Sequence, residues 1–292
     1  MLRRTPTGMR GPAVLLLAAL LASCGTPHPS AADRCPLGDS DGALASGGQT
    51  RAYRLFVPPG YRPGKALPLV LGFHGNGGTG AGFEGYSGFS ALAASVGFIA
   101  IYPEGLGQPQ GWDTWAGSQD VQFVRDLVDA AAARCAVDPR RIYAVGHSRG
   151  GGMANRLGCD LADRFAAVAG VSGAYEYGED CSPARPVPVI AFHGVDDPAV
   201  PYNGVPPGMR QAYFIIGTPI PQWAAAWAER DGCAADPAEI FRQGAVTGQA
   251  WSGCRGGAQV ALYTVAGGGH EWPAAVDAAR IIWEFFAAHP LP

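Results

Sequence analysis

The chain has 292 residues, of which 48% are hydrophobic and 15% are charged, and its net charge is −3. This balance is typical of a globular protein and excludes a disordered chain and a membrane protein with many spans. The mild acidity, without a basic stripe, argues against a nucleic-acid-binding protein.

The N-terminus has the layout of an export signal. Three arginines precede a short apolar run at residues 12–22, which is about half the length of a membrane-spanning helix. The run ends in Leu-Ala-Ser-Cys, which resembles a bacterial lipobox with Cys24 as the lipidated residue. We therefore expect a lipoprotein signal peptide at residues 1–23 and a protein anchored at the cell envelope. The alternative is ordinary cleavage near this point and a freely secreted protein.

The cysteines after Cys24 also favour export. There are six, and an even number indicates three disulfides in an oxidising compartment. Fifteen pairings are possible; closure of short loops favours Cys159–Cys181 and Cys233–Cys254, which leaves Cys35–Cys135. The sequence has no Cys-x-x-Cys motif and no histidine near these cysteines, so we expect no metal site.

Apolar runs alternate with helical patterns along the rest of the chain. Strands are predicted at residues 51–57, 67–73, 98–102, 141–145, 166–171, 187–192 and 259–265. Helices are predicted at residues 120–135, 150–161, 222–230 and 275–288. Asp120 is the expected N-cap of the first helix, and Asp138-Pro139 an expected turn. Residues 24–49 are expected to be a tether and N-terminal loop, followed by one α/β domain at residues 50–292, a mostly parallel central sheet with helices on both faces.

The sequence Gly-His-Ser-Arg-Gly at residues 146–150 lies between a predicted strand and a predicted helix. This Gly-x-Ser-x-Gly pattern is typical of a nucleophile elbow, in which serine occupies a strained turn and the glycines avoid clashes. The helix that follows would direct its N-terminus toward a developing oxyanion. A second match at residues 38–42 has no predicted strand before it and no predicted helix after it. We interpret that match as a loop and Ser148 as the nucleophile.

A serine hydroxyl needs a general base. His270 follows the last predicted strand in a Gly-Gly-Gly-His segment and fits the chain order Ser, Asp, His. We expect it to be the base, whereas His147 is expected to point away from the serine. Asp196 and Asp197 both follow the strand predicted at residues 187–192, and both are candidates for the acid that orients the base.

The oxyanion hole requires two backbone N–H donors. Arg149, directly after the nucleophile, is expected to supply one, and Asn76, in the glycine-rich loop after the strand at residues 67–73, the other. That loop lacks the Gly-Lys-Ser/Thr ending of a phosphate-binding loop, so we expect no nucleotide site. We expect an aromatic-lined cleft in which substrate contacts Trp112, Trp115 and Trp272.

These motifs, in this order, resemble the polyhydroxybutyrate depolymerase and feruloyl esterase family of α/β-hydrolases, in its bacterial lipoprotein branch. The matching segments are YRLFVPPGY at 53–61, LVLGFHGNGG at 69–78, GHSRGGGMA at 146–154, AFHGVDDPAVPYNG at 191–204, WAERDGC at 227–233 and GGGHEWP at 267–273. In that family the acid is the third residue after a His-Gly pair, which implies Asp197. The family also implies a disulfide across the region of Cys233 and Cys254.

The resemblance implies an exported serine esterase that hydrolyses polyhydroxybutyrate-type, feruloyl or acetyl esters through an acyl-enzyme. Ser148 would attack the ester, His270 would accept its proton, and Asp197 would orient the imidazole. We expect no cofactor and a monomer whose partners are small or polymeric esters and, through the lipid anchor alone, a membrane. A serine peptidase on the same fold and a non-catalytic binding lipoprotein are the alternatives. No long apolar lid helix is evident, which favours short-chain, hydroxyalkanoate or hydroxycinnamoyl esters over long-chain lipids.

Overall fold

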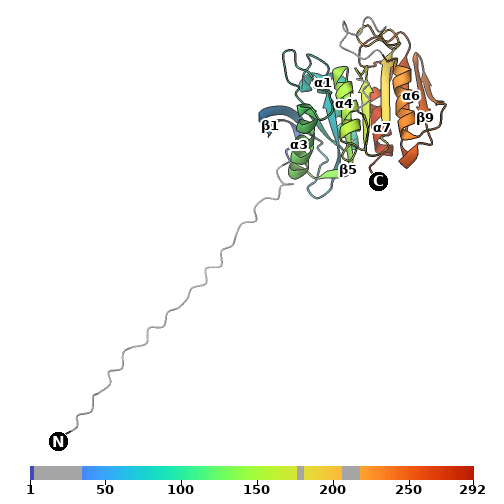
Figure 1. Ribbon diagram of the computed structural model, residues 1–292. Helices are drawn as coiled ribbons and strands as arrows, with labels where there is room; N and C mark the ends of the chain where they lie inside the picture. The colour runs from blue at the N-terminus through green and yellow to red at the C-terminus, as the bar shows by residue number, and fades with distance from the viewer. Residues whose placement is uncertain (3–34, 176–180, 206–217) are drawn as a thin grey trace.

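A computed structural model describes residues 1–2, 35–175, 181–205 and 218–292, and within these ranges ten strands form one sheet (Figure 1). The strands are β1 (Gly38–Ser46), β2 (Gln49–Val57), β3 (Leu67–Phe73), β4 (Ile99–Pro103), β5 (Val137–His147), β6 (Ala167–Val171), β7 (Val189–Gly194), β8 (Ala238–Gln243), β9 (Val246–Trp251) and β10 (Val260–Val265). The helices are α1 (Gly80–Ser87), α2 (Phe89–Val96), α3 (Gln119–Arg134), α4 (Arg149–Asp160), α6 (Ile220–Asp231), α7 (Ala278–Ala288) and the short 3-10 helix η3 (Arg255–Gly257). Cys24 and most of the expected signal peptide lie outside the described residues.

The strand order across the sheet is β1-β2-β4-β3-β5-β6-β7-β10-β9-β8. Neighbouring strands from β4 to β10 in this order pair in parallel, whereas β1, β2, β9 and β8 join the two edges antiparallel. The mostly parallel central sheet predicted from the alternation of strands and helices is therefore confirmed. The carboxyl ends of β5, β7 and β10 consequently lie along one edge of the sheet, where ligands bind in such folds.

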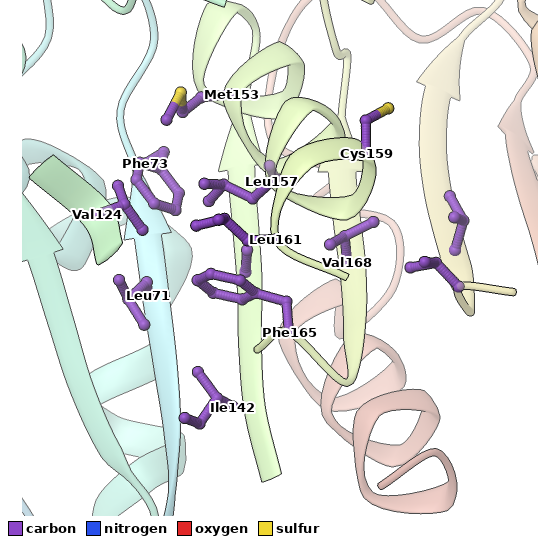
Figure 2. Packing of buried hydrophobic residues seen from close by; sticks show 14 of the residues in the cluster. Leu71, Phe73, Val124, Ile142, Met153, Leu157, Cys159, Leu161, Phe165 and Val168 are labelled. Carbon is purple, nitrogen blue, oxygen red and sulfur yellow. The ribbon is translucent and has the colours of Figure 1, made fainter. Parts of the chain in front are cut away.

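Two hydrophobic cores cover the two faces of this sheet. One core combines alternate residues of β3 and β5, such as Leu71 and Ile142, with apolar residues of α3, α4 and α6. Figure 2 shows part of this core, with Leu157 of α4 directed toward the strands. The other core takes the intervening residues, such as Val70 and Tyr143, and packs them against α1, α2 and α7. Since both faces are covered, the central strands are apolar at nearly every position, which explains their continuous hydrophobic runs.

The expectation that residues 38–42 form a loop is wrong, because these residues lie in β1. β1 pairs with β2 along its full length, and its residues alternate in exposure because it is an edge strand with one face toward solvent. Because many residues of β1 are polar, the sequence gives little hydrophobic signal for this strand, which is held by backbone pairing. The adjacent Gly47-Gly48, both with positive φ, turn the chain tightly between the two strands. The sheet therefore begins at Gly38, within the segment expected to be a tether and loop, rather than at residue 50.

Two local expectations also need correction. The N-cap of α3 is Ser118, whose hydroxyl accepts a hydrogen bond from the Val121 N–H. Asp120 is instead buried in an ion pair with Arg51 at 2.6 Å, so its carboxylate serves tertiary structure rather than the cap. Asp138-Pro139 is not a separate turn but lies within β5, near the start of that strand.

Three disulfides tie the described segments together: Cys35–Cys135, Cys159–Cys181 and Cys233–Cys254. The last two are the pairs favoured by closure of short loops, and Cys35–Cys135 is the pair that these two leave. The first links two cysteines that are 100 residues apart in the sequence, and it joins the N-terminal end of the domain to the end of α3. Within the described part of the chain, no helix combines the length and apolar character needed to cross a bilayer.

Candidate active site

Ser148 occupies the sharp turn between β5 and α4, with φ 56° and ψ −123°. A non-glycine residue in this region of backbone space is strained by about 1–3 kcal/mol. A Cβ atom at Gly146 would lie 2.0 Å from the carbonyl oxygen of Gly150, and one at Gly150 would lie 2.1 Å from that of Phe73. The two glycines of the motif are thus required by backbone packing, and the turn presents the serine hydroxyl above the sheet.

The structure brings Ser148, His270 and Asp197 into one hydrogen-bonded row. His270 Nε2 lies 2.9 Å from Ser148 Oγ, and His270 Nδ1 lies 2.8 and 3.0 Å from the two carboxylate oxygens of Asp197. Asp197 follows β7 and His270 follows β10, and these strands are parallel neighbours in the sheet. Because a carboxylate only accepts, His270 donates from Nδ1, which leaves Nε2 free to accept the serine proton.

Asp197 is held as a carboxylate although its side chain is fully buried. Burial alone would raise the pKa of Asp197, but hydrogen bonds from His193, from His270 and from the Val200 N–H lower it well below its usual range. The neighbouring Asp196 is exposed, and its only hydrogen bond to a described residue is from its backbone N–H to the Gly268 carbonyl at 2.9 Å. Of the two candidate acids, the structure therefore places Asp197 beside the imidazole.

The expected oxyanion-hole residues lie on two sides of Ser148. A Cβ atom at Gly75, next to Asn76, would lie 3.2 Å from the Ser148 Cβ, so this loop passes directly over the nucleophile. His74 fixes the loop, because its Nδ1 donates to the Gly75 carbonyl and its Nε2 accepts from the Gly105 N–H. Among the described residues, the backbone N–H groups of Asn76 and Arg149 have no hydrogen-bond acceptor, which leaves them available for a developing oxyanion.

A cavity of about 400 Å³ opens beside these donors. Asn76 and Arg149 line it, together with residues such as Leu106, Pro109 and Asp113. The Arg149 side chain is fixed there, because its Nε–H donates to the Trp112 carbonyl. The cavity is large enough for an acyl or alcohol group of modest size.

The three tryptophans do not form the expected aromatic-lined cleft together. Trp112 borders the cavity, but only 2% of it is exposed, and its indole N–H donates to the His74 carbonyl. Trp115 is 63% exposed and is not part of the cavity wall. Trp272 is half-buried against the aromatic rings of Phe83, Tyr86 and Phe89. The three indoles thus occupy a core, an open surface and an aromatic cluster, respectively.

The orientation expected for His147 from the sequence is wrong. His147 does not point away from the site: its Nε2 lies 2.8 Å from the His270 carbonyl oxygen, and the two imidazole rings are 5.1 Å apart. The position of His147 inside the elbow motif is visible in the sequence, but its contact with a residue 123 positions away is not. Within the described ranges, no group of three or more His, Cys, Asp or Glu residues is arranged to hold a metal ion.

Known esterases resemble this chain in sequence. Residues 51–203 match the family model Esterase PHB depolymerase. Feruloyl esterase B of Piromyces equi is 34% identical over 251 residues, which cover 80% of this chain and 44% of that protein, so the chain spans less than half of this relative. Feruloyl esterase C of Emericella nidulans is 30% identical over 252 residues, covering 82% of this chain and 84% of that protein.

A solved structure supports the fold independently. The acetyl xylan esterase from Aspergillus awamori superposes with a TM-score of 0.65 at 17% identity, covering 85% of this chain and 99% of that chain. At this identity the likeness shows the fold alone. The chain therefore belongs to the Esterase PHB depolymerase family, and it is a carboxylic ester hydrolase with the α/β-hydrolase fold.

Proposed function

We propose that the protein is an exported serine esterase that works through a Ser-His-Asp acyl-enzyme mechanism. The hydrogen-bonded row of Ser148, His270 and Asp197 carries this proposal. No other arrangement in the described residues combines a nucleophile on a strained turn, a base in contact with it and a buried carboxylate behind the base.

The chemistry follows from the atoms in contact. His270 Nε2 accepts the Ser148 hydroxyl proton as Oγ attacks the ester carbonyl carbon, and the Asn76 and Arg149 N–H groups stabilise the oxyanion. The carbon–oxygen bond to the leaving alcohol then breaks, and His270 gives its proton to that alcohol. Water, deprotonated by the same imidazole, attacks the acyl-enzyme and releases the acid and Ser148. Asp197 stays ionised throughout and stabilises the imidazolium.

For the substrate, we propose short-chain or hydroxyalkanoate esters and feruloyl or acetyl esters. The names of the relatives, feruloyl esterase and acetyl xylan esterase, support the latter two. The cavity beside the oxyanion donors is bounded by few large apolar side chains, and it suits a compact acyl group better than a long alkyl chain. A panel of methyl ferulate, acetylated xylan, hydroxybutyrate oligomers and long-chain triacylglycerol tests this proposal. The highest kcat/KM with triacylglycerol would reject it.

For the location, we propose export with a signal peptide at residues 1–23, lipidation of Cys24 and a short tether before β1. The three disulfides and the charge pattern of the N-terminus support export. The mature protein would be a monomer that meets the membrane through its lipid alone. Cys24→Ser should move the protein from the membrane fraction to the soluble fraction, whereas a wild-type protein that is unlipidated and wholly soluble rejects the anchor.

The mechanism is tested with p-nitrophenyl butyrate. Ser148→Ala and His270→Ala should each lower kcat by several orders of magnitude, and the double variant should be little slower, because the residues act as a unit. Near-normal turnover in either single variant would reject the assignment. A serine-directed phosphonate that labels the wild-type protein but not Ser148→Ala would identify the nucleophile directly.

A further inference from the structure

His147 joins the nucleophile turn to the loop that carries the base. It precedes Ser148, and its Nε2 lies 2.8 Å from the backbone carbonyl oxygen of His270. Its Nδ1 lies 3.3 Å from the hydroxyl of Tyr86, a residue of α1. The elbow thus contacts His270 twice, once at the imidazole through Ser148 and once at the backbone through His147.

These partners fix the tautomer of His147. A carbonyl oxygen can only accept, so Nε2 must carry a hydrogen, and in the neutral ring Nδ1 must then accept. Tyr86 supplies the donor, since a phenol hydroxyl keeps its proton at neutral pH. Burial also lowers the pKa of His147 and thereby favours the neutral ring. The titratable groups that act on His147 are Tyr86, His270, Asp197 and Glu271.

The loop before His270 is rich in glycine and is held by few contacts near the base. Three successive glycines, residues 267–269, precede the base, and glycine restricts the backbone less than any other residue. The loop is seated on Gly194, where a Cβ atom would lie 2.2 Å from the Gly268 carbonyl oxygen. The Asp196 N–H holds that carbonyl at 2.9 Å, and the Glu271 carboxylate accepts from the Gly269 N–H. Among the described residues, the bond from His147 is the one that holds the backbone of His270 itself to the elbow.

We propose that His147 is a positioning residue, which holds the His270 backbone at the distance from Ser148 that proton transfer requires, with Tyr86 as the partner that sets its tautomer. Nucleophile and base are then fixed to one turn and keep their separation when the loops around the site move. A displacement of about 1 Å in such a pair can slow the chemical step about a hundredfold without changing substrate contacts. The effect therefore falls on kcat rather than KM. This inference rests on the proposed serine esterase mechanism.

Three substitutions separate the two nitrogens of His147. His147→Gln retains an amide N–H close to the position of Nε2, His147→Asn retains one only near Nδ1, and His147→Leu retains neither. The substrate is p-nitrophenyl butyrate, and thermal melts check that each variant is folded. We expect kcat to fall about ten- to a hundredfold in His147→Leu and His147→Asn, with KM changed less than about threefold. His147→Gln should recover most of the loss.

Measurements on the wild-type protein and on Tyr86→Phe complete the test. Nitrogen-15 NMR of the histidine side chains should show the neutral His147 with its hydrogen on Nε2. In Tyr86→Phe the other tautomer should gain population, and kcat should fall less than in His147→Leu. The inference is overturned by a hydrogen on Nδ1 in the wild type, by equal kcat values in the Gln and Leu variants, or by a loss confined to KM. Full activity in Ser148→Ala would instead reject the proposed function, so the two failures are distinguishable.

Discussion

Asp231, at the end of α6, is a buried carboxylate that should make the stability of the protein depend on pH. Only 1% of the residue is exposed. One carboxylate oxygen accepts from the Val187 N–H at 3.2 Å, and the other has no hydrogen-bond partner in the described residues. Burial raises the pKa of Asp231 from 3.8 to about 6, although Val187 and the nearby Arg230, Arg185 and Arg255 act in the opposite direction.

A raised pKa means that the folded protein binds this proton more tightly than the unfolded chain does. Stability is therefore lost as pH rises through the interval from 3.8 to about 6, and it stays lower above that interval. The shift corresponds to a free energy of about 3 kcal/mol, at about 1.4 kcal/mol for each pKa unit. Asp231→Asn removes the titration. Its oxygen can keep the Val187 bond, while its amide nitrogen takes the place of the unpartnered oxygen and adds a penalty that does not vary with pH.

The assay is equilibrium unfolding in urea with the disulfides intact, at several pH values between 4 and 8. We expect the free energy of unfolding of Asp231→Asn to rise, relative to that of wild type, by about 2.4 kcal/mol between pH 4 and pH 7, since a small part of the full shift is already present at pH 4. Asp196→Asn, which removes the same charge from an exposed position, serves as the control. A stability of the variant relative to wild type that is independent of pH, or that falls between pH 4 and pH 7, would refute the argument.

Three further predictions address the site and the scaffold. Asp197→Asn should lower kcat by about three to four orders of magnitude, whereas Asp196→Asn should stay within about threefold of wild type in a p-nitrophenyl butyrate assay. The reverse ranking would contradict the contact with His270. Gly146→Ala should destabilise the fold by about 3 kcal/mol or more in urea, since its Cβ would overlap the Gly150 carbonyl, and a near-normal midpoint would show that the turn can relax. Replacing Cys35 and Cys135 by serine should lower stability by about 5 kcal/mol, against about 3 kcal/mol for the Cys159–Cys181 pair, because the loop of 100 residues is longer than that of 22. Equal losses would contradict the loop-closure argument.

The elbow could be located from sequence because its constraints are local and steric. Only glycine fits at Gly146 and Gly150. The central strands are also predictable, because burial on both faces requires continuous apolar runs. The edge strand β1 gives a weaker signal, since its polar side chains face solvent and its stability comes from backbone pairing with β2. The Gly47-Gly48 turn was the available indication of that hairpin.

The environment of aromatic side chains could not be inferred in the same way. Trp112 follows β4 and lies near the site, as the sequence predicts. Its ring is nevertheless buried, because it packs against Phe73 and its indole N–H donates to the His74 carbonyl. Whether an indole faces a cavity or a core depends on contacts with distant segments, which no local pattern encodes. The same applies to His147, whose partners Tyr86 and His270 lie 61 and 123 positions away.

The position of the elbow in the sheet explains how strain at Ser148 can persist. β5 lies between β3 and β6, and its side chains enter both cores, so the strand that delivers the serine is among the most constrained in the molecule. Backbone contact between Gly150 and Phe73 prevents the turn from relaxing toward β3. The acid and the base instead arrive on longer loops after β7 and β10, and these depend on hydrogen bonds such as those of His193 to the Val200 carbonyl and to Asp197. Substitutions at Gly146 and Gly150 should therefore affect folding and activity together, whereas substitutions at His193 should reduce activity more than stability.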